Sequence, residues 1–281
     1  MKQNFSYHTH TLFSDGKNTI DEMLEQAVKI GFKQIGISDH LIVHKNLTKM
    51  PSYCETTVGF DDFKTAREAC ARHAEQIRKA AKKYPLKVYV GYEVDYFTYN
   101  GWEDEFRDLA KKIDYDYFIS GNHFFMSENG EDIFDIWRYD DHPNTAPEEI
   151  SVYLRRHFQT MRQAVQSKMF FFLAHLDYAQ KIKDYRQNDY VKEINDVLKM
   201  LCKTKTGCEI STKGLRRYGH FFPSKDIIKA LIKQNIPLVI SDDAHHIDEL
   251  GSFFDKAEET LAALGASCRL KRQTGSPHIN H

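Results

Sequence analysis

The chain has 281 residues, of which 41% are hydrophobic and 13% aromatic, so it can bury a substantial core and intrinsic disorder is excluded. Its 14 glycines and 7 prolines are too few for a collagen-like or low-complexity protein. The 39 basic residues nearly balance the 40 acidic ones, so no global electric field would draw the chain to nucleic acid or to an acidic membrane surface.

The sequence carries no sign of export or of membrane insertion. The N-terminal residues are polar, and the longest strongly apolar run, residues 169–174, is too short to span a bilayer. The 5 cysteines form an odd set without a Cys-X-X-Cys pair, which is typical of free thiols in a reducing compartment. We therefore expect a cytoplasmic protein with no membrane association; the sequence does not indicate an oligomeric state.

Short apolar runs alternate with helical stretches from one end of the chain to the other, which predicts successive βα units. The expected strands are residues 5–8, 34–38, 88–93, 117–121, 170–174, 208–211 and 238–241.

Helix signals lie between these runs. Thr19 to Glu22 form a capping box that opens a helix expected over residues 20–30, and Gly31 stands where a C-terminal cap belongs. Further helices are expected over residues 63–83 and 147–167, and between Ser224 and Pro237. No Pro-, Gly- or Ser-rich boundary interrupts this order. This continuous order of βα units favours a single domain that spans residues 1–281. Its parallel sheet would be either closed as a barrel or open and doubly wound.

Histidines and carboxylates follow the ends of the predicted strands. They are His8, His10, His40, Glu93, His123, His175, Asp243 and His245. In a parallel barrel every strand ends on the same face, so these side chains would converge on one site. Their order therefore favours the barrel over the open sheet.

The spacing of these residues suits a metal site. A single histidine at a strand end is more often structural, but here several lie in register. His8 and His10 share one side of an extended segment because side chains repeat with period two, and Asp243 and His245 do the same. Imidazole and carboxylate without thiolate suit zinc, manganese or iron. His73 and His157 lie within charged helices and are expected to be structural.

These residues resemble those of the polymerase and histidinol phosphatase (PHP) superfamily of metal-dependent phosphoesterases. The matching motifs span nearly the whole chain and are Tyr7-His8-Thr9-His10-Thr11 with Asp15-Gly16, Ser38-Asp39-His40, Gly91-Tyr92-Glu93-Val94-Asp95-Tyr96, Gly121-Asn122-His123, His175-Leu176-Asp177 and Ser241-Asp242-Asp243-Ala244-His245.

Within the superfamily, the chain looks most like the histidinol-phosphate phosphatases of histidine biosynthesis. The likeness lies in residues 91–96, in the long helix over residues 63–83 and in the stretch from Glu209 to Arg216. Ser211 replaces the usual Asn of that stretch, and Lys213 replaces the usual Ser. These changes fall at the expected substrate mouth, so a nucleotide, a sugar phosphate or phosphotyrosine stays open as an alternative substrate.

The resemblance implies a distorted seven-stranded (βα)7 TIM-like barrel with three divalent metal ions at the C-terminal ends of the strands. It implies that His8, His10, Glu93 and Asp243 hold the first ion, that Glu93, His123 and His175 hold the second, and that Asp15, His40 and His245 hold the third. Residues from about 270 to 281 are expected to form a flexible tail.

Such a site would hydrolyse a small-molecule phosphomonoester by in-line attack of a metal-bridging hydroxide, since metal coordination supplies hydroxide at neutral pH. Glu93 and Asp243 would serve catalysis through the metal ions. The third ion, or an acid among Asp177, His220 and Asp242, would assist the departing alkoxide. Arg216, Lys213 and His220 are candidate substrate ligands. The expected reaction is hydrolysis of L-histidinol phosphate to L-histidinol and phosphate; a non-catalytic metal-binding module is the remote alternative.

Overall fold

The structure is a computed structural model that describes residues 3–50, 53, 58–136, 147–183 and 185–267. The tail expected from about residue 270 lies outside the described residues.

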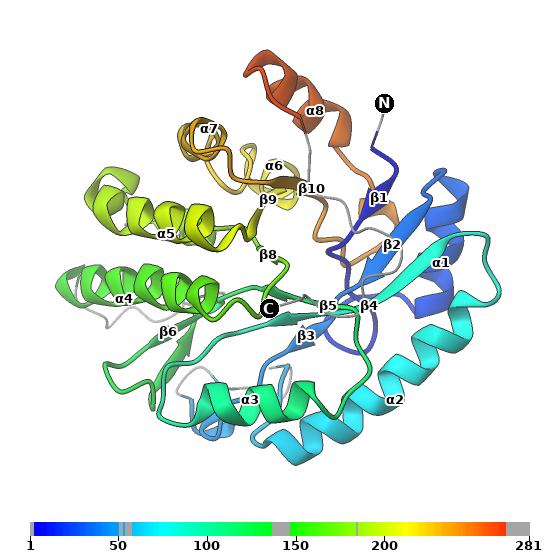
Figure 1. The fold of residues 1–281 in the computed structure, drawn as a ribbon, viewed down its shortest axis with the longest axis horizontal. Helices are drawn as coiled ribbons and strands as arrows, with labels where there is room; N and C mark the ends of the chain where they lie inside the picture. The colour runs from blue at the N-terminus through cyan, green and yellow to red at the C-terminus, as the bar shows by residue number, and fades with distance from the viewer. Residues whose placement is uncertain (1–2, 51–52, 54–57, 137–146, 184, 268–281) are drawn as a thin grey trace.

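A mostly parallel sheet forms the centre of the molecule, and the helices lie around its outside (Figure 1). Neighbouring strands follow the order β1 (Phe5–Ser6), β2 (Gln34–Ile37), β4 (Lys87–Val94), β5 (Tyr117–Ser120), β8 (Phe172–Leu173), β9 (Gly207–Ser211) and β10 (Leu238–Ser241). The seven strands correspond one to one to the expected runs, and the α/β barrel architecture is confirmed.

The sheet is nearly closed into a barrel. Beyond the ends of β1 and β10 the chain pairs again through a parallel bridge between Thr9 and Ala244. His10 N donates to Ala244 O at 2.8 Å, and the Gln3 side chain donates to Ile240 O at 2.6 Å. These bonds hold the first and last strands together at both ends of the barrel.

The main helices are α1 (Ile20–Lys29), α2 (Phe63–Ala81), α3 (Trp102–Ala110), α4 (Pro147–Gln166), α5 (Val191–Thr204), α6 (Lys213–Tyr218), α7 (Lys225–Lys233) and α8 (Phe254–Ala263). The capping box of α1 is confirmed, because Thr19 N donates to Glu22 Oε2 at 2.8 Å and Glu22 N donates to Thr19 Oγ1 at 3.3 Å. Gly31, with φ +84°, follows the C-terminal end of α1, as its position in the sequence predicts.

Some elements differ from the expectation. The strand expected over residues 5–8 ends at Ser6, because Thr9 N bonds to the Ser38 side chain rather than continuing a regular ladder. A short strand, β3 (His40–Leu41), joins β4, and an antiparallel hairpin of β6 (Phe124–Met126) and β7 (Ile133–Asp135) lies outside the main sheet.

Aromatic rings fill the barrel interior below the strand ends. The Tyr117 ring lies so close to two neighbouring strands that a Cβ on Gly36 or Gly91 would meet it at 1.9 or 2.4 Å. Tyr89, Gly91 and Glu93 alternate along β4 and so share the inward face. Glu93 therefore stands above a packed aromatic layer, which makes the barrel a solid support for the site and not a channel.

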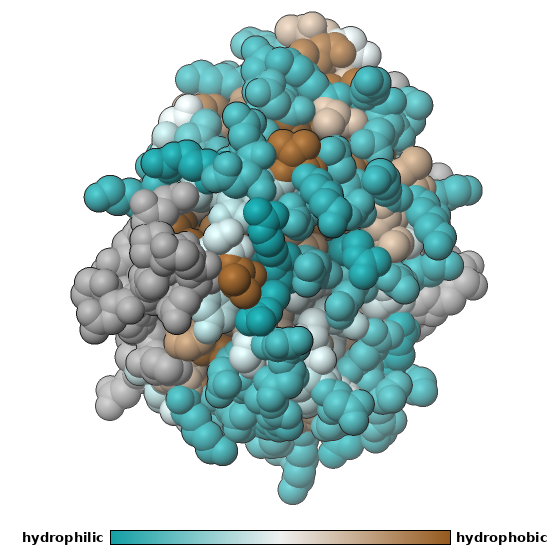
Figure 2. Space-filling model, turned by 90° about the vertical axis from the view of Figure 1, so that its left-hand side faces the viewer, coloured by the Kyte–Doolittle hydropathy of each residue, from teal (hydrophilic) through white to brown (hydrophobic). Residues whose placement is uncertain are grey.

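In the part of the chain that the structure describes, no helix is long and apolar enough to cross a membrane. On the face drawn in Figure 2, hydrophobic residues form small scattered patches within a mainly hydrophilic surface.

Candidate metal centre

Glu93 lies at the centre of the polar cluster at the strand ends and is fully buried. Its Oε1 atom is 2.9 Å from His175 Nε2 and 3.4 Å from His123 Nε2. Its Oε2 atom is 3.1 Å from His8 Nε2, 3.3 Å from His10 Nε2 and 3.2 Å from His40 Nδ1. The two oxygens of one carboxylate thus face two separate groups of histidines, which is the geometry of a bridging ligand.

Asp243 closes one side of the cluster. Its Oδ1 atom is 3.3 Å from His10 Nε2 and 3.4 Å from His245 Nδ1. Its Oδ2 atom is 3.0 Å from the ammonium of Lys213, the first residue of α6. The backbone of Asp243 has φ +48°, a conformation that non-glycine residues adopt rarely and that is common at functional sites.

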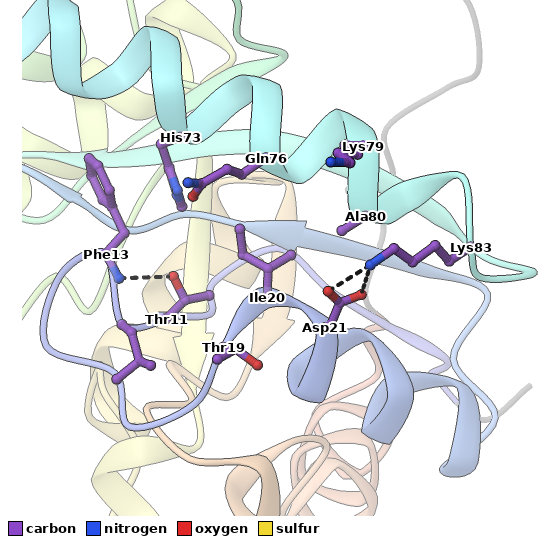
Figure 3. A pocket seen from close by; sticks show the side chains of 11 residues that line it. Thr11, Phe13, Thr19, Ile20, Asp21, His73, Gln76, Lys79, Ala80 and Lys83 are labelled. Carbon is purple, nitrogen blue, oxygen red and sulfur yellow. Dashed lines mark hydrogen bonds and ion pairs between the residues drawn. The ribbon is translucent and has the colours of Figure 1, made fainter.

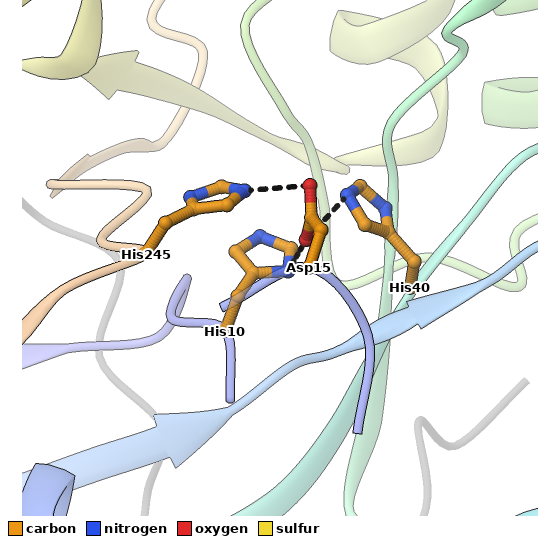
Figure 4. Close-up of side chains that lie close together, drawn as sticks. All are labelled: His10, Asp15, His40 and His245. Atoms are coloured by element: carbon orange, nitrogen blue, oxygen red, sulfur yellow. Dashed lines mark hydrogen bonds and ion pairs between the residues drawn. The ribbon is translucent and has the colours of Figure 1, made fainter. Parts of the chain in front are cut away.

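Asp15 lies at the outer edge of the cluster, with 39% of its side chain exposed. Figure 4 shows its carboxylate between three histidines: Oδ1 is 3.4 Å from His40 Nε2 and 3.7 Å from His10 Nδ1, and Oδ2 is 3.2 Å from His245 Nε2. Atoms of these four residues lie within 4.8 Å of one another.

Buried atoms without a hydrogen-bond partner show that this cluster suits metal ions. They include His8 Nε2, both ring nitrogens of His10, Glu93 Oε2 and Asp243 Oδ1. Leaving such groups unsatisfied costs free energy, yet here they face one another. Imidazole nitrogens and carboxylate oxygens around a common centre are the donor set of zinc, manganese and iron sites. The residues present therefore fit divalent metal ions.

The charged groups around Glu93 and Asp243 keep these carboxylates ionised, which is the form that binds metal. Burial raises the pKa of Glu93, but the charges of His8, His123 and His40 outweigh it and hold the pKa well below its usual range. Burial likewise raises the pKa of Asp243, and Lys213 and His8 more than reverse the effect. Both carboxylates are consequently ionised at neutral pH.

Two further carboxylates support the histidines from outside the cluster. Glu209 Oε1 lies 2.7 Å from His8 Nδ1, and its Oε2 accepts a bond from His175 N at 2.8 Å. Asp95 Oδ2 lies 3.0 Å from His123 Nδ1. Each carboxylate occupies the Nδ1 side of a ring and so turns Nε2 toward Glu93, as outer carboxylates of metal sites commonly do.

Sequence reasoning assigned no role to Glu209 or Asp95, although both carried a signal. Glu209 is the charged residue of β9, a strand in which every residue is buried. Asp95 follows Glu93 by two residues and so shares its side of the extended segment. Tyr178 was also missed: its buried ring lies 4.9 Å from the ring of His175 and 5.5 Å from that of His123, forming a wall of the site.

The structure brings the nine predicted metal ligands into one cluster. Groups that could each hold an ion include His10, Asp15, His40 and His245; His8, His10 and Asp243; and Glu93, His123 and His175. These groups overlap the three predicted ligand sets, with His10 also near the outer set. Two further groups cut across those sets: His8, His175 and Glu209, and His40, Asp95 and His123. Ligation of metal by these residues stays a prediction.

The remaining predicted residues lie around this cluster in different settings. Asp177 is fully buried and accepts a bond from Ser224 N at 2.8 Å, and burial raises its pKa to about 7. His220 is half-buried after α6, with its ring 6.1 Å from that of Tyr218 and 5.5 Å from that of Phe222. Roles of Asp177 in proton transfer and of His220 in substrate binding stay predictions.

Arg216 has extensive contacts within the protein. Its guanidinium donates to Ser252 Oγ at 2.9 Å and to the carbonyl oxygens of Asp242 and Asp243 at 3.1 and 3.3 Å. It also lies 3.3 Å from the Glu249 carboxylate. These contacts join α6 to the segment after β10, a structural task that the sequence pattern did not reveal; its predicted contact with phosphate stays a prediction.

Comparisons with known proteins identify the family of this chain. The family model of the PHP domain matches residues 6–213. A histidinol-phosphatase from Bacillus subtilis is 23% identical over 269 residues, covering 88% of this chain and 96% of the relative.

Solved structures share the fold. The histidinol phosphate phosphatase of Lactococcus lactis, solved with zinc, L-histidinol and phosphate, aligns over 93% of this chain and 94% of its own with a TM-score of 0.69 and 15% identity. A chain of archaeal ribonuclease P aligns over 92% of this chain and 83% of its own with a TM-score of 0.50 and 12% identity, so the fold alone does not decide the substrate. With most of its length matched by the family model, the chain belongs to the PHP domain family and is a phosphatase.

Proposed function

We propose that this phosphatase hydrolyses L-histidinol phosphate to L-histidinol and phosphate with the help of divalent metal ions. The observation that carries the proposal is Glu93, whose two oxygens face His123 and His175 on one side and His8, His10 and His40 on the other. The names of the relatives, together with the L-histidinol and phosphate bound to the Lactococcus lactis enzyme, support the choice of substrate.

The proposed ligands divide into three sets. His8, His10, Glu93 and Asp243 would hold one ion, Glu93, His123 and His175 a second, and Asp15, His40 and His245 a third. Divalent ions held there would supply hydroxide at neutral pH and neutralise charge that develops on the phosphoryl group.

The chain's own residues would complete the site around the phosphate. Glu209 and Asp95 keep His8 and His123 oriented toward Glu93. Lys213 carries an ammonium beside Asp243, where it can hydrogen-bond a phosphate oxygen as a point charge. We assign Arg216 and His220 to the same rim as substrate contacts, and Asp177, whose pKa burial raises to about 7, to proton delivery toward the leaving oxygen.

Lys213 favours a second candidate substrate. Histidinol carries an ammonium near its phosphate ester, and the positive charge of Lys213 would repel it if the two came close. The hydroxyl groups of a sugar phosphate would instead accept hydrogen bonds from Lys213. We therefore keep a sugar phosphate, which carries no ammonium, as the second candidate substrate.

Phosphate release from a panel of phosphomonoesters tests the proposal. Protein reconstituted separately with zinc, manganese or iron is assayed against histidinol phosphate, a hexose phosphate, a nucleotide and phosphotyrosine, with a Glu93→Gln variant as the control for contaminating phosphatases. We expect the highest kcat/KM with histidinol phosphate. A higher value for the hexose phosphate would replace the primary proposal by the second.

A further inference from the structure

The loop between His10 and Gly16 carries Asp15 into the candidate metal centre, and this loop is exposed on one side. Leu12 is 61% exposed, and Leu12 and Phe13 border a groove of about 590 Å³ between the loop, α1 and α2. Figure 3 shows His73 projecting from α2 toward this loop. Because open space borders the loop here, its position depends on a few specific contacts.

Asp39 supplies one group of those contacts. This fully buried carboxylate accepts hydrogen bonds from Thr11 N at 2.6 Å, from Thr11 Oγ1 at 2.7 Å and from Ser14 Oγ at 2.6 Å. Three donors of the loop thus converge on one side chain. Because Asp15 directly follows Ser14, these bonds also restrain the backbone from which Asp15 enters the metal centre.

His73 connects that carboxylate to α2. Its Nε2 atom lies 2.9 Å from Asp39 Oδ2, and the imidazole is only 1% exposed. The same ring stacks on Phe13, with ring centroids 3.9 Å apart and planes 11° from parallel. One side chain of α2 therefore contacts both the anchor of the loop and the loop itself.

We propose that His73 is a positioning residue for the metal subsite formed by His10, Asp15, His40 and His245. Because His73 contacts both Asp39 and Phe13, it holds the loop against α2. This limits the positions that the exposed Asp15 carboxylate can occupy. A mobile ligand loses conformational freedom when it binds an ion, so holding it in place beforehand increases affinity. The inference concerns metal binding and does not depend on the proposed substrate.

The effect should be confined to one subsite. Of the four residues of that subsite, only Asp15 lies on the loop; His40 lies on β3, and His10 and His245 lie beside the bridge that closes the barrel. The group of Glu93, His123 and His175 lies on β4, after β5 and after β8. Loss of the His73 contacts should therefore lower the affinity for one metal equivalent and leave the affinity for the others unchanged.

The test is a titration of zinc or manganese alone into metal-free protein, with a competing colorimetric chelator to resolve each equivalent. His73→Phe keeps a ring against Phe13 but removes the contact with Asp39. We expect one equivalent to bind about ten- to hundredfold more weakly, the usual cost of losing a group that orients a metal ligand. His73→Gln, which restores a polar side chain beside Asp39, should recover part of that affinity.

The matched control is His157→Phe, the same substitution at another buried helical histidine. It should leave the equivalent held by Asp15 unchanged. A general packing defect would instead weaken every equivalent in His73→Phe and lower the thermal midpoint of the metal-free protein well beyond that of the control. Either of those results would overturn the proposal, as would unchanged binding of every equivalent.

Two further variants keep the proposal testable if His73→Phe folds poorly. Phe13→Ala removes the stacking partner from the exposed loop and should weaken the same equivalent. Asp15→Asn should weaken that equivalent directly, and adding Phe13→Ala to it should then have little further effect. Full additivity of the two changes would show that the contact between Phe13 and His73 does not act through Asp15.

Discussion

The ammonium of Lys213 lies 3.0 Å from Asp243 Oδ2, whereas His10 Nε2 lies 3.3 Å from the other oxygen, Oδ1. Asp243 is thus shared between a lysine and the candidate metal centre. Burial lowers the pKa of Lys213, but the charges of Asp243 and Asp15 outweigh it and raise the pKa, so the lysine stays positively charged. A fixed cation at this position bears on substrate choice more than on the chemistry of phosphate cleavage.

We predict that Lys213→Ser changes selectivity among phosphomonoesters. Removing the ammonium removes its repulsion of the histidinol ammonium, so the ratio of kcat/KM for histidinol phosphate to that for a hexose phosphate should rise about tenfold, equivalent to about 1.4 kcal/mol. The measurement is phosphate release from both substrates by one metal-loaded preparation. Lys213→Met, which keeps the length but not the charge, should behave alike; equal changes for both substrates would contradict the prediction.

A second prediction concerns Glu93. Glu93→Gln replaces a bridging carboxylate by a neutral amide and should lower kcat by at least about a hundredfold, since even outer groups of metal sites contribute ten- to hundredfold. Phosphate release and metal counting on the same samples test this. His220→Gln at the rim serves as a control that retains metal. A near wild-type rate for Glu93→Gln, or hydrolysis that resists chelators, would contradict a metal-dependent mechanism.

The sequence predicted much of the candidate site because chain order and strand geometry place its residues. His8, His123 and His175 follow β1, β5 and β8 of one parallel sheet, and parallel strands end on one face. The alternation of β4 likewise directs Glu93 inward. For these residues, local pattern and topology are sufficient.

Other features depend on contacts between distant segments, which a single sequence does not show. His73 looked like one polar residue on a charged helix, but its partners Asp39 and Phe13 lie 34 and 60 residues earlier in the chain. The hairpin of β6 and β7 was missed although Asn129 and Gly130 indicate a turn. The strands on either side of that turn are too short to show a period of two.

A third prediction concerns the exposed subsite. Asp15 is 39% exposed whereas Glu93 is 1% exposed, so water reaches the outer subsite more readily than the buried ones. We expect the ion held there to leave first, so stepwise dialysis followed by metal counting should show one equivalent lost before the others. Simultaneous loss of all bound metal would contradict this order.

A fourth prediction separates two roles of Arg216. If its guanidinium grips phosphate, Arg216→Ala should lower kcat/KM about tenfold to 150-fold, as expected for a bond to a charged group of about 1.5 to 3 kcal/mol, with metal content unchanged. If it mainly holds the carbonyl of Asp243, metal affinity should fall with the activity. We expect the first result, and inhibition by inorganic phosphate should weaken in parallel. Arg217→Ala, at an exposed neighbour that contacts Glu249, is the matched control.

The last prediction concerns acid stability and the buried His157 of α4. Burial lowers its pKa from 6.5 to about 3, and its ring packs edge-on against Phe125 at 5.7 Å. Between pH 6.5 and about 3 the unfolded chain binds a proton at this residue and the folded chain does not. The free energy of unfolding should therefore fall as the pH falls through this window.

His157→Phe removes that proton uptake. The stability of the wild type relative to the variant should decline by about 1 kcal/mol for each pH unit below about 6. Urea unfolding from pH 4.5 to pH 7.5, with chelator in every sample so that metal loss adds nothing, measures the difference. Met161→Leu, a change in the same helix without a titratable group, should shift stability equally at every pH. Parallel curves for the wild type and His157→Phe across this range would contradict the prediction, because they would show that His157 binds the same number of protons in the folded and unfolded protein.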